Sequence, residues 1–197
     1  MLGTIKMKKV LIFLLGALIG IAGTTGYYAT KQIEQPISTS LSKTEVYFSP
    51  SKECENGLIK LINNSTESID IAVYSINNTN IVNALKQAHA RGIKMRILTD
   101  RTQASGKTSL VKELKDAGID IRVHSKHKIE HNKFAIFDGK QASTGSYNWT
   151  NPASDKNSEN CVFFFTDTTV INAYKERFEY LWKVNTEEAS VKWFKKQ

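Results

Sequence analysis

The sequence predicts an α/β fold, with a mixed, largely parallel β-sheet flanked by helices on both faces. The first observation behind this prediction is that apolar segments of strand length alternate with amphipathic segments of helix length, the pattern of βαβ crossovers. The second is the apolar run Phe134–Phe137, typical of a strand buried on both faces. A chain of 197 residues has room for one domain with a hydrophobic core.

The elements are expected in a regular order. Strands are predicted at residues 45–48, 68–74, 94–99, 120–123 and 161–165. Helices are predicted at residues 53–63, 80–90, 109–117 and 168–182. Gly92 and Gly118 follow the second and third helices, as glycine does at many helix C-termini. Asp138-Gly139 is typical of the two-residue turn of a β-hairpin, which adds antiparallel pairing to the sheet.

The N-terminal segment is expected to direct export. Three lysines precede an apolar run from Val10 to Ala22, which has the length of the apolar region of a signal peptide. The weakly polar stretch continues to Tyr28, so a membrane anchor over residues 8–28 is the alternative. In both cases the folded domain is expected outside the cytoplasm, secreted or periplasmic. The chain divides into a signal peptide or anchor (1–29), a linker (30–44) and a folded domain (45–197).

Charge and cysteine content set broad limits on the partners and the compartment. The formal net charge is +8, and a basic surface attracts phosphate polymers and anionic lipid surfaces alike. Cys54 and Cys161 could pair in an oxidising compartment. Because Cys161 lies in an apolar strand-like run, a buried thiol is the favoured interpretation.

The residues that flank the predicted hairpin carry the clearest chemical signal. If Asp138-Gly139 forms the turn, Phe137 faces Lys140. Counting back along both strands then gives two further opposed pairs, Lys133 with Thr144 and His131 with Ser146.

Side chains alternate along a strand, so one face of this hairpin is expected to hold four polar residues. They are His131, Lys133, Ser146 and Asn148. A nucleophile or base, a positive charge and two neutral hydrogen-bonding groups around one point are typical of a site for a phosphate diester.

The full pattern H-x-K-x4-D-x6-G-S-x-N, with a further acid at Glu159, resembles the signature of the phospholipase D superfamily. That signature is an HKD motif with a trailing Gly-Ser and Asn, and the resemblance extends from Val46 to Trp182. It is strongest to small exported bacterial members with one HKD motif per chain, which include phospholipase D enzymes and metal-independent endonucleases. The resemblance implies a phospholipase D-like α-β-α sandwich.

The resemblance also implies a mechanism. One copy of His131 attacks phosphorus to form a phosphohistidine, and a second copy protonates the leaving group. Because one chain holds one motif, a homodimer with a shared active site is expected. Glu159 is expected to hold the distal nitrogen of the imidazole.

The remaining motif residues have expected roles as well. Lys133 is expected to stabilise charge on the phosphate, and Ser146 and Asn148 to hydrogen-bond it. Asp138 completes the catalytic motif, although the turn places it away from the site and favours a structural role.

Two substrate classes stay open, phosphatidylcholine-like phospholipid as the favoured one and nucleic acid as the alternative. Tyr147 and Trp149 could line a lipid pocket or stack on a base. The C-terminal segment Val184–Lys196 could lie on an anionic bilayer, or pack as a helix on its own domain. A binding module without catalysis is a third class, disfavoured by the complete set of motif residues.

No cofactor or metal is predicted. His124, His127 and His131 have suggestive spacing, but no acid or cysteine ligand lies close in sequence and neighbouring lysines would repel a cation. Gly106-Lys107-Thr108 resembles the end of a P-loop, yet Arg101 stands where that pattern requires glycine. The loop 101–108 is instead expected at the rim of the site.

Overall fold

The computed structural model describes residues 43–196. The predicted signal peptide or anchor, and all but the last two residues of the predicted linker, lie outside the described residues. Among residues 43–196, no helix combines the length and the apolar character needed to cross a bilayer.

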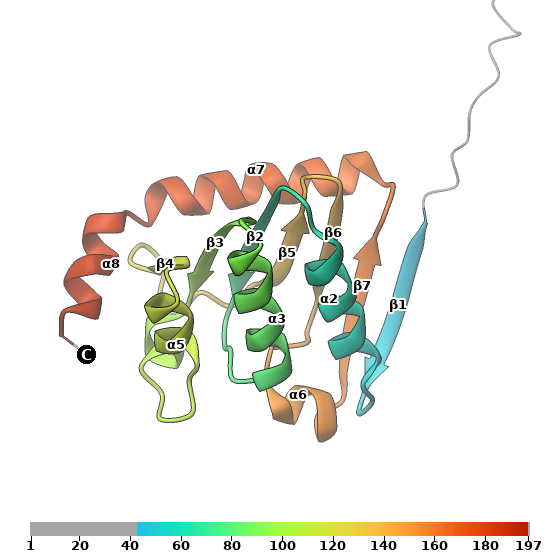
Figure 1. The fold of residues 1–197 in the computed structure, drawn as a ribbon, viewed down its shortest axis with the longest axis horizontal. Coiled ribbons are helices and arrows are strands. Elements are labelled where there is room, and N and C mark those ends of the chain that lie inside the picture. The colour runs from blue at the N-terminus through green and yellow to red at the C-terminus, as the bar shows by residue number, and fades with distance from the viewer. Residues whose placement is uncertain (1–42, 197) are drawn as a thin grey trace, which may run out of the picture. The chain divides into compact units, whose positions relative to one another are not determined.

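A seven-stranded mixed sheet lies at the centre of this domain (Figure 1). Its strand order is β1-β7-β6-β5-β2-β3-β4. The strands are β1 (Thr44–Ser49), β2 (Ser68–Val73), β3 (Lys94–Thr99), β4 (Asp120–Val123), β5 (Lys133–Phe137), β6 (Gln141–Gly145) and β7 (Glu159–Phe164).

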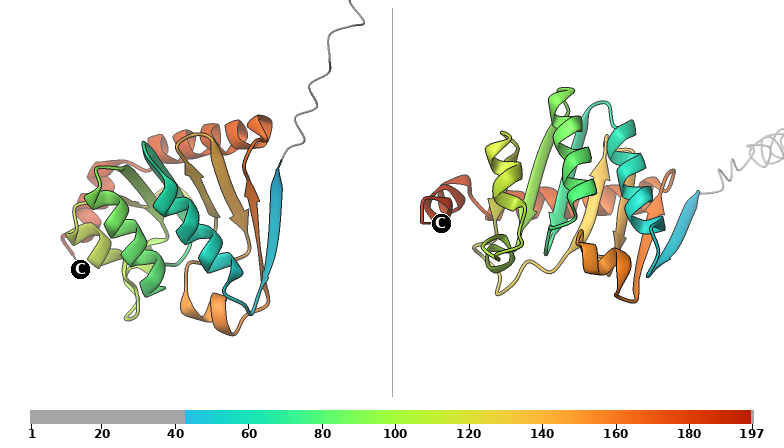
Figure 2. Two further views of the ribbon diagram at one scale, coloured as in Figure 1. Left: turned by 45° about the vertical axis from the view of Figure 1, so that its right-hand side comes forward. Right: turned by 60° about the horizontal axis from the view of Figure 1, so that its bottom comes forward.

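Helices cover both faces of the sheet, which confirms the predicted α/β class. Helices α2, α3 and α5 lie on one face, and the long helix α7 crosses the other (Figures 1 and 2). The helices are α2 (Glu53–Asn64), α3 (Thr79–Ala90), α4 (Arg101–Ala104), α5 (Val111–Asp116), α6 (Asn151–Asp155), α7 (Thr168–Val184) and α8 (Glu187–Phe194).

The sheet holds fewer parallel pairs than predicted. Only the pairs β2–β3 and β3–β4 are parallel, while the pairs β1–β7, β2–β5, β5–β6 and β6–β7 are antiparallel. The reason is that helical crossovers join neighbouring strands only from β2 to β4. Strand β1 also precedes a helix, but it lies at the far edge of the sheet, beside β7.

Strand β5 is buried on both faces, as its apolar run predicts. Ala135 and Phe137 belong to the core under α2, α3 and α5, whereas Phe134 and Ile136 belong to the core under α7. Five consecutive buried residues therefore fix β5 in the middle of the sheet, and with it the position of the residues just before it.

The predicted register of the hairpin is wrong by one residue. Phe137 faces Gln141, not Lys140. Asp138 and Gly139 do form the tight turn, with φ of 53° and 63°, and the Lys140 amide donates to the Phe137 carbonyl at 3.0 Å. Lys140 is then left over as a third loop residue, which shifts β6 by one position along β5.

The two cysteines form a disulfide between α2 and β7. Cys54 and Cys161 have Cα atoms 5.9 Å apart, a normal separation for a bridge. The predicted buried thiol at Cys161 is therefore wrong, because the start of α2 packs directly on β7 and brings the two side chains together.

The C-terminal segment forms helix α8, which packs on its own domain. Trp193 and Phe194 lie against the core beneath α5, and the Lys115 ammonium lies 5.8 Å from the centre of the Phe194 ring. These aromatic side chains therefore pack on the domain and are not presented to a bilayer. Of the two interpretations of this segment, the helix packed on its own domain is confirmed.

Candidate active site

The predicted site residues other than Asp138 gather at one edge of the sheet, where β1, β2 and β6 end and β5 and β7 begin. Val73, the last residue of β2, pairs with Lys133, the first residue of β5. On the other side, Gly145 at the end of β6 pairs with Cys161 near the start of β7, and Ser49 at the end of β1 pairs with Glu159. This edge lies at the bottom of Figure 1, beside α6.

Lys133 is the most buried of the predicted site residues. Its side chain is 9% exposed, and Nζ donates to the His131 carbonyl at 2.6 Å. Burial lowers the pKa of Lys133 below its ordinary value, while the charges of Glu159 and Glu130 oppose this shift. The ammonium also lies 4.9 Å from the centre of the Tyr74 ring, a favourable cation–π position.

His131 is exposed at the same edge and rests on an aromatic ring. The centre of its imidazole lies 4.7 Å from that of Tyr74, with the planes inclined by 56°. The Tyr74 hydroxyl accepts a hydrogen bond from Gln103 Nε2 at 2.9 Å. Tyr74 thus contacts both His131 and Lys133, although sequence reasoning did not single it out. The available signal was its position directly after a buried strand.

The loop that leads into His131 is held by buried carboxylates. Glu130 is 1% exposed, and its Oε1 accepts hydrogen bonds from the amide and side chain of Asn132 at 3.2 and 2.6 Å. The Glu130 amide donates to Asp100 Oδ2 at 3.2 Å. The same oxygen lies 3.2 Å from Nδ1 of the buried His124. His131 is therefore flanked on both sides by residues tied to the core.

Ser146 and Glu159 are joined directly. The Ser146 hydroxyl donates to Glu159 Oε2 at 2.5 Å and accepts from the Asn160 amide at 3.1 Å. The other carboxylate oxygen accepts from Asn157 Nδ2 at 3.0 Å. Among the described residues, the Glu159 carboxylate forms no hydrogen bond with the imidazole of His131, contrary to the expectation for a single chain.

A bulge, and not regular alternation, brings Ser146 to the site. The one-residue shift of register sends the side chains of β6 to the opposite face, so the predicted pairs Lys133–Thr144 and His131–Ser146 do not form. Instead, the amides of Ser146 and Tyr147 both donate to the Asn160 carbonyl, at 3.1 and 3.2 Å. Ser146 and Tyr147 thus lie opposite one residue, Asn160, and this β-bulge changes the direction in which the following side chains point.

Gly145 makes this bulge possible. Its φ is 146°, and a Cβ at this position would lie 2.2 Å from the Asn160 carbonyl oxygen. Glycine allows the close approach of β6 to β7. This explains why glycine precedes serine in the motif: the bulge that positions Ser146 has no room for a side chain at residue 145.

The two aromatic residues that follow do not line the site. Tyr147 and Trp149 are each 2% exposed and lie in the core, so the expectation that they contact substrate is wrong. Burial raises the pKa of Tyr147 to about 12, and its hydroxyl lies 2.5 Å from Ser154 Oγ. They fix the intervening Asn148, which is half-buried and whose Oδ1 has no hydrogen-bond partner among the described residues.

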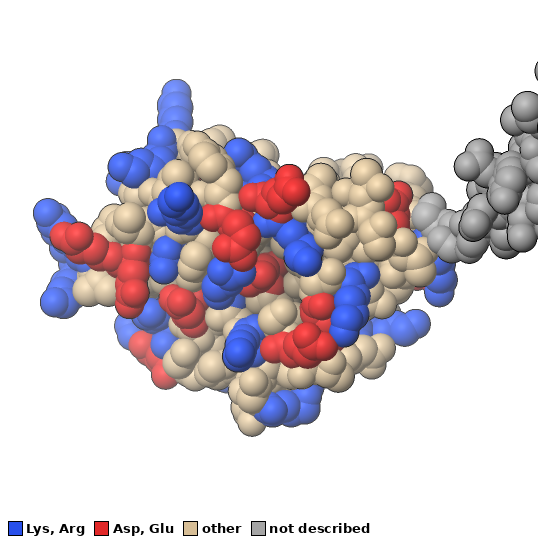
Figure 3. Space-filling view, turned by 90° about the horizontal axis from the view of Figure 1, so that it is seen from above, with Lys and Arg blue, Asp and Glu red and all other residues tan. Residues whose placement is uncertain are grey.

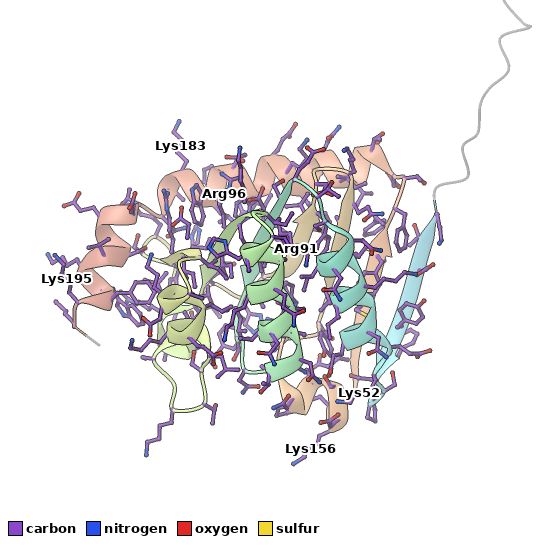
Figure 4. All side chains as sticks on the ribbon, in the orientation of Figure 1. Lys52, Arg91, Arg96, Lys156, Lys183 and Lys195 are labelled. Carbon is purple, nitrogen blue, oxygen red and sulfur yellow. A yellow bond between two sulfur atoms is a disulfide. The ribbon has the colours of Figure 1, made fainter. Side chains whose placement is uncertain are left out.

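Beneath this segment lies a buried carboxylate, Glu55. Burial alone would raise its pKa, but hydrogen bonds from Asn80, Ser154, Asn78 and Lys52 prevail and lower it to about 2. Lys52 also pairs with Asp155 at 2.6 Å and lies at the lower edge of the molecule, like Lys156 (Figure 4). The network ties α2, α3 and α6 together behind the site.

Comparison with known proteins identifies the family. The family model described as "Cardiolipin synthase, PLD-like domain" matches residues 58–182. A protein named phospholipase D from Rickettsia conorii is 33% identical over 180 residues, 84% of this chain and 90% of that protein. The chain belongs to the phospholipase D superfamily. Its class of chemistry is phosphodiester hydrolysis.

Other members of the superfamily are similar over different lengths. A mitochondrial cardiolipin hydrolase from Chlamydomonas reinhardtii is 34% identical over 121 residues, 61% of this chain and 54% of that protein. The crystal structure of Nuc from Salmonella typhimurium, a phospholipase D family member, superposes with a TM-score of 0.68 at 28% identity and covers 72% of this chain and 95% of Nuc. NucT from Helicobacter pylori has a TM-score of 0.66 at 28% identity, with 71% and 95% covered.

In this phospholipase D superfamily member, Asp138 is not brought to the cluster. It lies at the opposite end of β5, about 23 Å from His131 if the chain rises about 3.3 Å per residue. Its carboxylate accepts hydrogen bonds from the amides of Thr66, Glu67 and Ser68 at 2.8 to 3.1 Å. Burial raises the pKa of Asp138, but these hydrogen bonds outweigh burial and lower it.

Metal ligands are not grouped in the part of the chain that the structure describes. No cluster of three or more His, Cys, Asp or Glu side chains suited to a metal occurs within residues 43–196. His124, whose spacing drew attention in the sequence, is occupied by Asp100 and by the Arg101 amide, which donates to its Nδ1 at 3.1 Å.

Proposed function

We propose that the protein is a metal-independent phosphodiesterase that hydrolyses phosphatidylcholine-like phospholipids through a phosphohistidine intermediate. The observation that carries the proposal is that an exposed imidazole, His131, and an enclosed ammonium, Lys133, both contact the Tyr74 ring at the end of the sheet that also holds the Ser146–Glu159 hydrogen bond. A nucleophile that substrate can reach then lies next to a cation that water cannot fully screen.

The reaction has two steps. In the first, a nitrogen of His131 forms a bond to phosphorus, the bond from phosphorus to the leaving alcohol oxygen breaks, and a second imidazole donates a proton to that oxygen. In the second, the now neutral second imidazole takes a proton from water. The hydroxide oxygen bonds to phosphorus as the bond between His131 and phosphorus breaks.

The second imidazole is proposed to come from another copy of the same chain. The described chain offers no other histidine in contact with Lys133 or Tyr74, and His124 is 1% exposed and paired with Asp100. The exposed position of His131 at the end of the sheet suits a two-fold axis that passes through the site. A homodimer with one shared active site follows.

The other site residues are assigned to the phosphate and to the imidazole. Lys133 neutralises charge on the non-bridging oxygens, with hydrogen bonds from Ser146 and Asn148. Glu159 is proposed to hold the distal nitrogen of an imidazole in the assembled site. In the single chain its oxygens are held by Ser146 and Asn157. In the assembled site the imidazole is proposed to replace the Ser146 hydroxyl on Glu159, which frees the one proton of that hydroxyl for the phosphate.

Lipid is the favoured substrate because the relatives named phospholipase D match most of this chain. The alternative is an exported, non-specific endonuclease that acts by the same mechanism. One observation favours it, the exposed basic residues Arg101, Lys126 and Lys128 around the site, which could follow a sugar–phosphate backbone.

We further propose that the domain works outside the cytoplasm. The Cys54–Cys161 disulfide supports this assignment, since such bonds persist in oxidising compartments. An alkaline phosphatase fused after Gln197 should be active in intact cells. Activity only after lysis and oxidation would contradict export.

The substrate is tested by giving the protein phosphatidylcholine vesicles and single-stranded DNA in parallel, with a chelator present and His131→Ala as the blank. Choline release that depends on His131, without DNA cleavage, is the expected result. DNA cleavage with intact lipid would establish the endonuclease alternative. Binding of both substrates without turnover would show a binding module and refute the enzyme.

A further inference from the structure

The loop between β4 and β5, which leads into His131, carries an exposed aliphatic side chain. Ile129 is 50% exposed and lies two residues before His131. Its neighbours in the loop, residues 124–128, are all polar or charged. Ile129 belongs to neither hydrophobic core cluster, so its side chain is available for contacts at the surface.

Three cations of the same loop and of the adjoining start of α4 are not neutralised within the described chain. Lys126, Lys128 and Arg101 are exposed, and none of them forms an ion pair with an acid of residues 43–196. The two acids of these loops, Asp100 and Glu130, are each 1% exposed and accept hydrogen bonds inside the fold. The surface presented beside Ile129 is therefore positive.

The opposite side of the molecule differs in this respect. Acidic and basic side chains alternate over the face seen from above, on the α7 side (Figure 3). One example is Arg96, which pairs with Asp70 at 2.7 Å and with Glu179 at 2.5 Å. Acids are interspersed among the basic residues on that face, whereas the exposed part of the loops beside the site carries basic residues without an exposed acid.

The loop is also held firmly enough to present these side chains in one place. The His124 ring contacts Asp100 Oδ2 at 3.2 Å and the Lys128 carbonyl at 3.3 Å. The Glu130 amide donates a hydrogen bond to the same oxygen, Asp100 Oδ2, at 3.2 Å. Both ends of the segment 124–130 are therefore fixed to the start of α4, and the segment runs along the edge of the sheet that carries the site (Figure 2).

We propose that Ile129, Lys126, Lys128 and Arg101, here called the docking rim, place the active site on an anionic bilayer. Ile129 enters the headgroup region, and the three cations bind anionic headgroups around it. This inference rests on the proposed lipid function. It adds that the enzyme works on assembled membranes, with the rim oriented so that His131 meets a headgroup phosphate.

A second exposed apolar residue lies on the other flank of the site. Phe48 is 65% exposed and precedes Ser49, whose hydroxyl accepts from the Glu159 amide at 3.1 Å. Apolar side chains therefore stand on both sides of Glu159 and His131 along one sheet edge.

Helix α8 provides a matched control, because it also combines an exposed apolar residue with lysines. Val191 is 39% exposed and lies beside Lys192, Lys195 and Lys196. However, Glu187 and Glu188 line the same surface. Lys195 also projects far from the edge where Lys52 and Lys156 lie (Figure 4). Docking through α8 would leave the site away from the membrane.

The experiment compares two physical forms of one substrate in the 197-residue chain. Choline release is measured on vesicles of phosphatidylcholine mixed with phosphatidylserine, and on short-chain phosphatidylcholine dissolved as monomers. The variants are Ile129→Ser, the double variant Lys126→Ser/Lys128→Ser, and Val191→Ser. We expect the ratio of vesicle rate to monomer rate to fall roughly tenfold for the first two, and the deficit of the lysine variant to vanish at high salt.

The control Val191→Ser should keep the wild-type ratio. An unchanged ratio in Ile129→Ser, or an equal fall in Val191→Ser, would overturn the docking rim. So would a loss of dimer in Ile129→Ser, which would assign the residue to the subunit interface. If the wild type releases no choline from either substrate, the proposed function fails, and sedimentation of the Ile129→Ser and wild-type chains with the same vesicles still decides docking.

Discussion

The aromatic ring of Tyr74 lies 4.7 Å from the imidazole of His131 and 4.9 Å from the ammonium of Lys133, measured to the ring centre in each case. One side chain therefore contacts both reacting groups of the motif. Its hydroxyl is in turn fixed by Gln103, which makes the first turn of α4 part of the support of the site.

Substitution of Tyr74 should separate the ring from the hydroxyl. In Tyr74→Leu the ring is lost, and we expect kcat to fall roughly tenfold because the imidazole loses an aromatic contact and the ammonium loses a cation–π partner. Tyr74→Phe keeps the ring and should stay within about threefold of the wild type. Steady-state kinetics on one substrate, with Gln103→Ala as a control for the hydroxyl contact, give the comparison. Equal losses in the Leu and Phe variants would contradict the role of the ring.

The alkaline limb of the pH–rate profile should report Lys133. Burial lowers the pKa of Lys133, and the negative charges of Glu159 and Glu130 oppose that effect. Activity that requires the ammonium is lost as pH rises through this pKa. Removing a negative charge lowers the pKa further, so Glu159→Gln and Glu130→Gln should both move the alkaline limb to lower pH.

The effect of Glu159→Gln should be the larger, because the charge of Glu159 opposes burial more strongly than that of Glu130. Glu159→Gln should also lower kcat about a hundredfold if this acid orients an imidazole. Rates measured across the alkaline range for both variants check these expectations. A limb that stays in place, or moves to higher pH, would show that Lys133 does not control it.

Acid stability should depend on Glu55. Its pKa is lowered from 4.5 to about 2 in the folded chain, so the stabilisation is present above pH 4.5 and is lost as pH falls toward 2. A shift of this size corresponds to about 3 kcal/mol. Glu55→Gln should lower the free energy of unfolding at neutral pH and flatten its decline in acid. Denaturant titrations at several pH values, with the exposed Glu53→Gln as control, measure both effects.

Removing the disulfide should destabilise the domain without changing the site. Cys54 and Cys161 are 107 residues apart in sequence, and closing a loop of this length stabilises by about 5 kcal/mol in the chain-entropy model. The double variant Cys54→Ala/Cys161→Ala should therefore unfold at lower denaturant concentration. Reduction of the wild type should produce a similar shift, and absence of any shift on reduction would argue against the bond.

Much of the fold could be predicted because local patterns encode it. The strands at 94–99 and 120–123 have the predicted bounds, since short apolar segments between helices allow few alternatives. The balance of parallel and antiparallel pairs could not be predicted, because it depends on which distant strands become neighbours. The place of β1 beside β7 is one such long-range choice.

The closeness of four candidate site residues could be predicted, but their geometry could not. His131, Lys133, Ser146 and Glu159 lie at one sheet edge, yet the hairpin register that grouped them was wrong. Ser146 reaches Glu159 through a bulge that requires the pairing of β6 with β7, and a turn motif carries no information on that pairing. Tyr74 comes from a distant strand for the same reason.

The central claim, that two copies of His131 form one active site, is tested most directly with a defined heterodimer. Wild-type and His131→Ala chains with different tags are produced together, and the dimer that carries one of each is isolated by two affinity steps. A wild-type dimer with the same two tags is the control. Because the nucleophile and the proton donor are both His131, the mixed dimer should be inactive. A mixed dimer with about half the control activity, as expected of independent subunits, would contradict the shared site.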